Sequence, residues 1–298
     1  MPIPIVRYGP QRRPEDRAIA EWLRGRPSGA ALHLPLVVDQ NQELNYQYAT
    51  LFHHHPLING FTGWASPLQE LLRQPRAPLY DYERYPATVR MLRSLGVRYV
   101  FVHPGEYGVS PLRTAELTNT VDGFRLSGQV HTEARLLDVY AFDLEPFDSS
   151  RGSGDTLQPM PASEFRVEVS PGSDRTALLV DGDNDTRWMA MQDGTGAITV
   201  RFGEPRDVAR LALQLSPRSM LDYPRDLQID AQDREGRVRT LYRATPYPEF
   251  IAGFLRDRFY PSMQIDLPRN DTTVLWVRDL ATYDTWWSVY ELRLWRRQ

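Results

Sequence analysis

The chain has 298 residues and a formal net charge of −3 at pH 7, which predicts two domains and argues against a general binding surface for nucleic acid or an anionic membrane. Cysteine is absent, so disulfides, thiolate catalysis and cysteine-ligated metal centres are excluded. Lysine is absent too, and all 35 cationic side chains are arginine, so a Walker-type lysine and a Schiff-base lysine are excluded.

The first half of the chain alternates helical and extended patterns. Residues 14–26 predict a helix, because acidic side chains occupy the first turn and Ile19, Trp22 and Leu23 share one face. A short apolar run at 30–38 predicts a buried strand.

A second helix–strand pair follows. Residues 86–95 predict a helix that Gly96 ends, and the apolar run 97–103 predicts a strand. Residues 125–144 predict a hairpin that closes the edge of the sheet. Together these elements predict a small α/β domain over residues 1–147.

The second half begins after a stretch of small, polar and turn-forming residues at 148–160, which buries little apolar surface and predicts a linker. Seven short segments then alternate apolar and polar side chains. This pattern predicts a β-sandwich or jelly roll over residues 161–298, so the fold class expected for the whole chain is α+β with two domains. The segments are 165–169, 198–202, 208–215, 227–230, 263–267, 274–277 and 289–295.

Three consecutive histidines, His53–His55, suggest a metal site. Adjacent side chains of a strand point to opposite faces, so only His53 and His55 could share an ion. No acidic residue at a suitable spacing completes the site, which favours a packed or solvent-facing histidine run. His33 and His103 belong to apolar strands, and we expect them to be hydrogen-bonded at the rim of the sheet.

The densest oxygen cluster is Asp181–Thr186, where three carboxylates fall within five residues. Such carboxylates repel one another unless a cation or solvent lies between them, and calcium prefers six to eight oxygen ligands. Spacing alone favours the alternative, a solvated turn closed by aspartate side chains.

Residues 180–188 (VDGDNDTRW) resemble the early signature of discoidin-type, or coagulation-factor type C, domains of the galactose-binding-like superfamily. Residues 286–294 (WWSVYELRL) resemble the closing strand of these domains. The resemblance covers roughly residues 158–298, and it implies a jelly roll that binds carbohydrate without catalysis. The intermediate elements occur in the expected order at 198–203, 208–213, 223–225 and 227–230.

In this family a structural calcium often ties the aspartate loop to the glutamate of the last strand. The resemblance therefore implies a metal site built from two side-chain carboxylates, one hydroxyl and three backbone carbonyls. The carboxylates are those of Asp181 and Glu291, the hydroxyl is that of Thr186, and the carbonyls are those of Leu178, Asp183 and Tyr290.

Sugar-binding members of the family use loops at one end of the barrel. Aromatic faces there stack on sugar C–H groups, while arginines and carboxylates bond the hydroxyls. For each aromatic candidate, packing in the core is the alternative role. The candidates in this chain are Tyr223, Arg225, Tyr247, Phe250, Tyr260 and Trp286.

Parts of the first half resemble the segment that follows the last transmembrane helix in bacterial GT-C membrane glycosyltransferases, which use polyprenyl-phosphate sugars. The resemblance implies an extracytoplasmic location, periplasmic or at the cell surface, and a catalytic acidic residue in a membrane region that this chain does not contain. No run of about 18 apolar residues occurs here, so we expect the chain to be soluble or the soluble piece of a larger protein. The matching segments are 14–24, 29–35, 46–60 and 95–103.

No catalytic machinery is recognisable. The sequence has no Gly-x-Ser-x-Gly, His-Glu-x-x-His or Gly-x-Gly-x-x-Gly motif. We therefore expect a non-catalytic module whose partners are a glycan or lipid-linked saccharide and a membrane-embedded glycosyltransferase region. Two alternatives remain open: a structural module that binds protein or lipid, and an enzyme whose titratable groups converge between the two domains.

Overall fold

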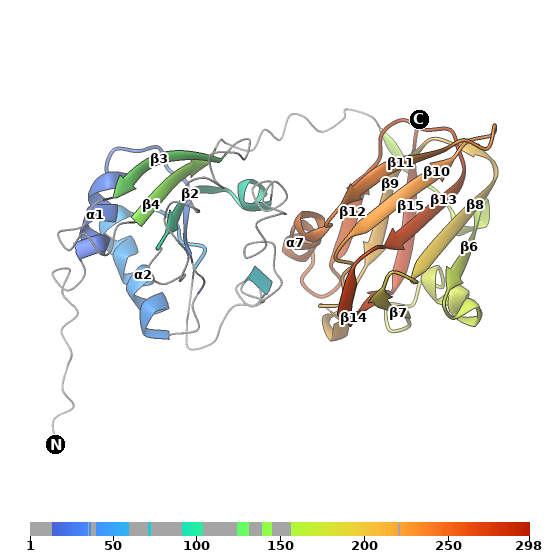
Figure 1. Ribbon diagram of the computed structural model, residues 1–298, viewed down its shortest axis with the longest axis horizontal. Coiled ribbons are helices and arrows are strands. Elements are labelled where there is room, and N and C mark those ends of the chain that lie inside the picture. Colours follow the sequence, from blue (N-terminus) through green and yellow to red (C-terminus); the bar gives the residue numbers. More distant parts are fainter. Residues whose placement is uncertain are drawn as a thin grey trace, which may run out of the picture. The chain divides into compact units, whose positions relative to one another are not determined.

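The structure is a computed structural model, and it divides into two compact units, residues 1–148 and 149–298 (Figure 1). No helix in the described part of the chain is long and apolar enough to cross a membrane. The structure describes residues 14–34, 36, 40–59, 71–72, 91–103, 124–130, 139–144, 156–219 and 221–298.

The first unit contains a four-stranded sheet with strand order β1-β2-β4-β3. Strands β1 and β2 are parallel and are connected through a segment that contains α2, whereas β3 and β4 form an antiparallel hairpin beside β2. This arrangement confirms the predicted α/β pattern and the hairpin. The elements are α1 (Pro14–Leu23), β1 (Ala30–Leu34), α2 (Gln40–His53), β2 (Val97–Val102), β3 (Phe124–Val130) and β4 (Val139–Leu144).

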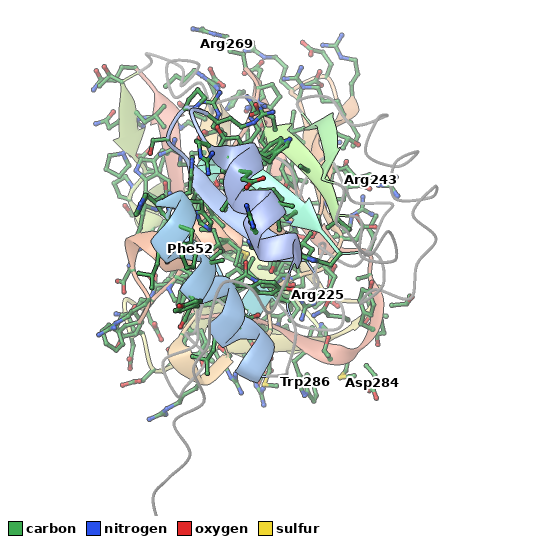
Figure 2. All side chains as sticks on the ribbon, turned by 90° about the vertical axis from the view of Figure 1, so that its left-hand side faces the viewer. Phe52, Arg225, Arg243, Arg269, Asp284 and Trp286 are labelled. Carbon is green, nitrogen blue, oxygen red and sulfur yellow. The ribbon has the colours of Figure 1, made fainter. Side chains whose placement is uncertain are left out.

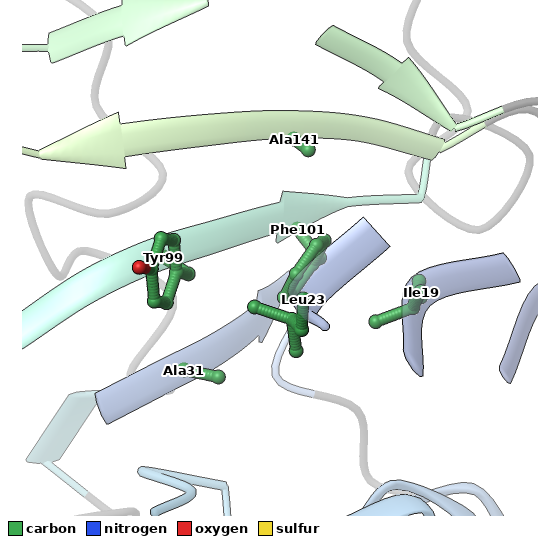
Figure 3. Close-up of a cluster of buried hydrophobic side chains, with 6 residues drawn as sticks. All are labelled: Ile19, Leu23, Ala31, Tyr99, Phe101 and Ala141. Atoms are coloured by element: carbon green, nitrogen blue, oxygen red, sulfur yellow. The ribbon is translucent and has the colours of Figure 1, made fainter. Parts of the chain in front are cut away.

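Helix α1 packs its apolar face on this sheet. Ile19 and Leu23 are buried against Ala31, Phe101 and other sheet residues (Figure 3). The Trp22 ring meets the rings of Tyr99 and Phe101 edge to face, with centroids 5.7 and 5.6 Å apart, a favoured aromatic geometry. The periodicity that predicted this helix therefore identified the core of the first unit.

Helix α2 was not predicted, because its apolar side chains do not share one face. Tyr46 and Ala49 are buried, whereas Leu44, Leu51 and Phe52 are exposed. The predicted strand 30–38 ends at Leu34, and residues 35 and 37–39 lie outside the described residues, as does most of the predicted helix 86–95. Its described end, residues 91–94, is helical.

The second unit is a β-sandwich of two antiparallel sheets, as predicted (Figure 1). One sheet has the order β11-β10-β13-β8-β6, from β6 (Phe165–Ser170), β8 (Ala197–Arg206), β10 (Leu227–Gln232), β11 (Val238–Ala244) and β13 (Thr272–Asp279). The other has the order β12-β9-β15-β5, from β5 (Leu157–Pro159), β9 (Val208–Gln214), β12 (Ser262–Asp266) and β15 (Glu291–Arg297).

Further elements complete this unit. Strands β7 (Trp188–Asp193) and β14 (Thr282–Val289) form an antiparallel pair, in which buried Trp188 and Trp287 meet edge to face with centroids 5.0 Å apart. Helix α7 (Tyr247–Arg256) follows β11. Short 3₁₀ turns are η5 (Ala162–Glu164), η6 (Ser173–Leu179) and η7 (Pro217–Ser219).

Three features of the second unit differ from expectation. The predicted linker 148–160 is wrong at its end, because Leu157–Pro159 form β5 and pair with β15. Strand β11 was missed because its residues are largely exposed and do not alternate. Helix α7 was missed although six of its residues are buried. It packs so closely on β12 that a Cβ at Gly253 would collide with the backbone of Ser262.

Candidate functional site

Two hydrogen bonds bring connections of the second unit together at one end of the sandwich. The Gly182 N–H donates to Glu291 Oε1 at 2.7 Å, which joins the acidic turn to the start of β15. The Ser288 N–H donates to the Asp222 carbonyl at 2.9 Å, which places the β9–β10 connection beside β14. Trp286 and Asp284 lie at this end, opposite Arg269 (Figure 2).

The acidic turn is closed by its own side chains. Asp181 Oδ1 accepts the Asp183 N–H at 2.9 Å, and Asp183 Oδ1 accepts the Asp185 N–H at 2.9 Å. The Thr186 hydroxyl donates to Asp181 Oδ2 at 2.8 Å. These bonds form the turn closed by aspartate side chains that spacing alone favours over a metal site. They also fix the positions of the turn's oxygen atoms.

The acidic turn and the last strand bring two carboxylates together. Glu291 is buried, and burial is the main cause that raises its pKa; the neighbouring Asp181 carboxyl raises it further, while the Gly182 N–H acts in the opposite direction. Because like charges repel, a cation between the Asp181 and Glu291 carboxylates would lower the free energy of the folded state. The predicted contact between this turn and Glu291 is therefore present in the structure.

The oxygen atoms around this pair suit a hard cation. Carboxylate, hydroxyl and carbonyl oxygens are the ligands that calcium prefers, and Asp181, Thr186 and Glu291 converge here. The Asp183 carbonyl lies 3.2 Å from the Thr186 hydroxyl, which donates to it. Leu178 lies in η6, and Tyr290 directly precedes β15.

Among the described residues, no group of three or more His, Asp or Glu side chains is arranged to hold a metal ion. A calcium site at the acidic turn would therefore depend on backbone carbonyls as well as on its two carboxylates. The ion itself stays a prediction.

Three of the aromatic candidates belong to the core, so their proposed role as ligand platforms is wrong. Tyr223, Tyr247 and Phe250 are 2%, 1% and 0% exposed. The Tyr223 ring stacks on Phe250 with centroids 4.8 Å apart and an interplanar angle of 15°. Tyr247 and Phe250 both belong to the apolar face of helix α7, and this face packs on Tyr223.

Arg225 also has a packing role. Its side chain is buried, its guanidinium carbon lies 3.6 Å from the centroid of the Tyr223 ring, and an Nη2–H donates to the Leu221 carbonyl at 3.0 Å. This cation–π contact stabilises the buried aromatic group. Arg225 therefore packs inside the unit, and its charge is not presented at the surface.

Two candidates remain available to a ligand. Trp286 is 46% exposed and Tyr260 is 38% exposed. Gln192 Nε2–H donates to the carbonyls of Trp286 and Tyr223, at 2.8 and 3.2 Å, and holds β14 against the β9–β10 connection. The backbone that carries Trp286 is thus fixed in place.

Sequence reasoning missed a polar cluster that joins β14 to the β9–β10 connection. Asp222 Oδ2 accepts the Ser288 hydroxyl at 2.8 Å and pairs with Arg187 Nη1 at 3.3 Å. Burial raises the pKa of Asp222, against the hydrogen bond from Ser288 and the charge of Arg187. No motif identified these residues, although Arg187 lies within the segment that resembles the discoidin-type signature.

Comparison with known proteins gives similarities of structure only. No protein-family model and no curated protein sequence matches the chain.

A family 32 CBM of NanJ from Clostridium perfringens, in complex with galactose, is 17% identical over 47% of this chain and 100% of that chain, with a TM-score of 0.36. An F5/8 type C domain from Bacteroides fragilis is 16% identical over 49% of this chain and 99% of that chain, with a TM-score of 0.38. CpGH89CBM32-5 from Clostridium perfringens, in complex with GalNAc-β-1,3-galactose, is 13% identical over 46% of this chain and 99% of that chain, with a TM-score of 0.35.

The described histidines of the first unit lie at or near the ends of α2, β1 and β2. His33 Nδ1 lies 3.0 Å from His103 Nε2, so the two rings are hydrogen-bonded as expected, but both are buried rather than placed at the rim of the sheet. His53 ends α2 and is not part of a strand, which corrects the geometry assumed for His53–His55. His53 Nδ1 accepts the His55 N–H at 3.0 Å, so this nitrogen is already occupied.

Proposed function

We propose that the second unit is a non-catalytic carbohydrate-binding module, and that its binding surface is the loop end that carries Trp286 and Tyr260. The observation that supports this most is the exposure of Trp286, at 46%, directly before the fully buried Trp287. An indole face presented from a fixed strand suits the C–H face of a sugar ring, since it loses little conformational freedom on binding.

Polar groups near this surface fit sugar hydroxyls. Arg187 can donate and Asp222 can accept, and their mutual contact and the bond from Ser288 hold both side chains in position. Pre-organised polar groups beside an aromatic platform give specificity at a small entropic cost.

The experiment is a calorimetric titration of the full chain, with and without calcium, preceded by a glycan array. Galactose and GalNAc-β-1,3-galactose serve as first probes. Trp286→Ala is expected to lower affinity by about fivefold or more, because an aromatic contact contributes roughly 1 kcal/mol beyond its buried area. The matched control is Val238→Ala, an exposed apolar residue of β11 that lies away from this end.

Saccharide binding that survives Trp286→Ala would move the site elsewhere. A wild-type chain that binds no saccharide on the array would remove the carbohydrate-binding proposal altogether.

We propose calcium as the structural ion of this unit. Asp181, Thr186 and Glu291 would hold it together with the carbonyls of Leu178, Asp183 and Tyr290. When bound, the ion supplies charge neutralisation for two carboxylates that otherwise repel each other. Its effect would be to join the start and the end of the sandwich.

A specific observation supports a second candidate function, binding to protein or lipid. Leu221, Leu255 and Phe259 are 42%, 50% and 55% exposed near the same end, and exposed apolar side chains that gather on one surface are typical of such interfaces. Co-sedimentation with neutral and anionic vesicles tests it, with Phe259→Ser as the variant. Vesicle binding that depends on Phe259, with no saccharide binding, would favour this candidate.

We also infer, from the resemblance described above, that the chain is the extracytoplasmic, C-terminal soluble part of a bacterial GT-C membrane glycosyltransferase. Catalysis would then reside in the membrane region of the parent protein. The genomic DNA directly upstream tests this: in-frame codons for membrane-spanning helices are expected, and a stop codon with no such helices would refute it.

A further inference from the structure

The five-stranded sheet of the second unit, with the order β11-β10-β13-β8-β6 (Figure 1), has an outer face that the proposed loop-end site does not use. Side chains of a strand alternate between the two faces of its sheet. In β13, Leu275 and Val277 are fully buried, so Trp276 between them lies on the outer face, where it is partly exposed. The Trp276 Nε1–H reaches solvent and has no hydrogen-bond partner among the described residues. An accessible indole is therefore part of this surface.

Four arginines lie on the same face, in the two rows of cross-strand neighbours on either side of the row of Trp276. Residues on one face of a strand are about 7 Å apart, so the two arginine rows are separated by about 13 Å. Cationic side chains therefore flank the indole on both sides. The arginines are Arg278 and Arg243 in one row, with Arg243 on the edge strand β11, and Arg201 and Arg166 in the other, with Arg166 on the edge strand β6.

Two of these arginines pair with carboxylates that lie in the row of Trp276. Arg278 Nη2–H donates to the buried carboxylate of Asp230. Burial would raise the pKa of Asp230, but the hydrogen bonds from its neighbours outweigh this effect and lower the pKa, so the carboxylate is ionised. Arg201 Nε–H donates to the Glu168 carboxylate at 3.2 Å. The Arg278 and Arg201 side chains are still 43% and 49% exposed, so both guanidinium groups keep N–H donors in contact with solvent.

Arg243 and Arg166 have no such carboxylate. Both are exposed, and neither makes an ion pair or a hydrogen bond with the described residues. Arg166 lies directly opposite Arg201, and like charges at directly opposed positions destabilise a sheet. Four guanidinium groups and two carboxylates give these three rows a net charge of 4 − 2 = +2, whereas the whole chain has −3. This surface is therefore complementary to an anion.

We propose that this face of the sheet binds an acidic polysaccharide, whose sugar rings stack on Trp276 and whose carboxylate or sulfate groups pair with the flanking arginines. The C–H face of a sugar ring suits an indole, and the planar guanidinium group can give two parallel hydrogen bonds to the oxygens of such an anion. An open sheet face suits an extended chain that contacts both arginine rows. Its residues differ from those of the loop-end site, so this proposal does not depend on saccharide binding there.

A single-stranded nucleic acid is the other polyanion that stacks on aromatic side chains. Proteins that bind it place successive bases on several aromatic side chains along a positively charged groove. The three described rows contain one aromatic side chain, Trp276, and the carboxylates of Asp230 and Glu168 lie on either side of it in its own row. This arrangement favours the saccharide, whose hydroxyl groups can donate to carboxylate oxygens.

The test is a calorimetric titration of the full chain with an oligosaccharide of galacturonic acid, with sulfated dextran, with neutral dextran of the same length and with single-stranded oligothymidylate. Saturable binding of an acidic saccharide is expected below about 1 mM, with no binding of neutral dextran. The affinity should fall as sodium chloride rises from about 50 to about 300 mM, because salt screens exposed charges.

Two pairs of variants locate the binding surface. Trp276→Ala is expected to weaken binding about fivefold or more, whereas Trp286→Ala at the loop end should leave it unchanged. Arg243→Gln is expected to weaken binding about threefold. Its matched control is Arg239→Gln, an exposed arginine of the same strand that lies opposite the buried Ala231 and therefore belongs to the other face. Far-UV circular dichroism establishes that each variant is folded.

The outcomes separate this site from the loop end. Tighter binding of the galacturonic acid oligomer would identify carboxylates as the anionic groups of the ligand, and tighter binding of sulfated dextran would identify sulfates. Acidic-saccharide binding without any neutral-saccharide binding would retain this site and remove the loop-end proposal. Equal affinities of Arg243→Gln and Arg239→Gln, loss of binding in Trp286→Ala, tighter binding of oligothymidylate, or no saturable binding of either acidic saccharide would overturn the inference.

Discussion

Asp279 gives the second unit a dependence of stability on pH that one substitution should remove. The side chain is 1% exposed at the end of β13. Its Oδ1 accepts backbone N–H bonds from Asp226 at 3.0 Å and from Ala281 at 3.3 Å. Its Oδ2 is buried, with no hydrogen-bond partner in the described part of the chain. Burial is the main cause that raises the pKa of Asp279 from 3.8 to about 6, against those two N–H bonds.

The sign follows from the higher pKa of the folded state, which binds the proton more tightly than the unfolded state. The contribution of Asp279 to stability is therefore fully present below pH 3.8 and is lost as the pH rises through about 6. The two pKa values differ by about 2 pH units, and each unit corresponds to about 1.4 kcal/mol, so the loss is about 3 kcal/mol.

Asp279→Asn keeps the Oδ1 acceptor and removes the charge. We expect the free energy of unfolding of the variant, relative to the wild type, to rise by about 3 kcal/mol between pH 4 and pH 7. Urea denaturation followed by tryptophan fluorescence measures this, since five of the seven tryptophans lie in the second unit. Asp284→Asn, at an exposed position (Figure 2), is the control. A difference between variant and wild type that is constant with pH would refute the reasoning.

Four further predictions concern other positions. Calcium should raise the melting temperature of the second unit and EDTA should reverse this, and an Asp181→Ala variant that still responds to EDTA would exclude the proposed ion. Because the pKa of His53 is lowered to about 4 from 6.5, the first unit should lose about 3 kcal/mol of stability as the pH falls from 6.5 to 4. In His53→Gln, which lacks the titrating group, the unfolding free energy from urea titrations should change less with pH. Gly253→Ala should destabilise the second unit by about 3 kcal/mol in urea, because its Cβ would meet the Ser262 backbone; an unchanged midpoint would show that α7 shifts freely. His54 adopts a φ of 58°, which glycine tolerates better, so His54→Gly should stabilise the first unit by about 1 kcal/mol and raise its melting temperature. A lower melting temperature of the variant would contradict the strain argument.

Alternation and periodicity predicted the elements that bury one face. Strands β6, β8, β9, β10, β12, β13 and β15 were expected from their apolar alternation, and α1 from its apolar stripe. Helix α2 has exposed apolar side chains at positions where a periodic pattern would place buried ones, and strand β11 is largely exposed on both faces. These elements are stabilised by contacts with distant parts of the chain, which a local sequence pattern does not reveal.

The sequence predicted the contact between the two distant motifs of the candidate site. It predicted poorly which aromatic side chains are exposed there. Asp181 and Glu291 were joined by resemblance alone, and the Gly182–Glu291 bond bears out the contact. Tyr223 and Trp286 are both aromatic residues near turns, yet the first is 2% exposed and the second 46%. The difference is caused by α7, whose Phe250 covers Tyr223. Without that helix in the prediction, the two rings could not be distinguished.

The pairing of β5 with β15 has a consequence for how the second unit can be used. The two strands are antiparallel neighbours, and the Gln298 N–H donates to the Thr156 carbonyl at 3.4 Å. The polypeptide therefore enters and leaves this sandwich at adjacent points, a geometry that tolerates grafting into a surface loop of another protein. Such a cassette would place little strain on its host, and circular permutation across this junction should leave the sandwich folded.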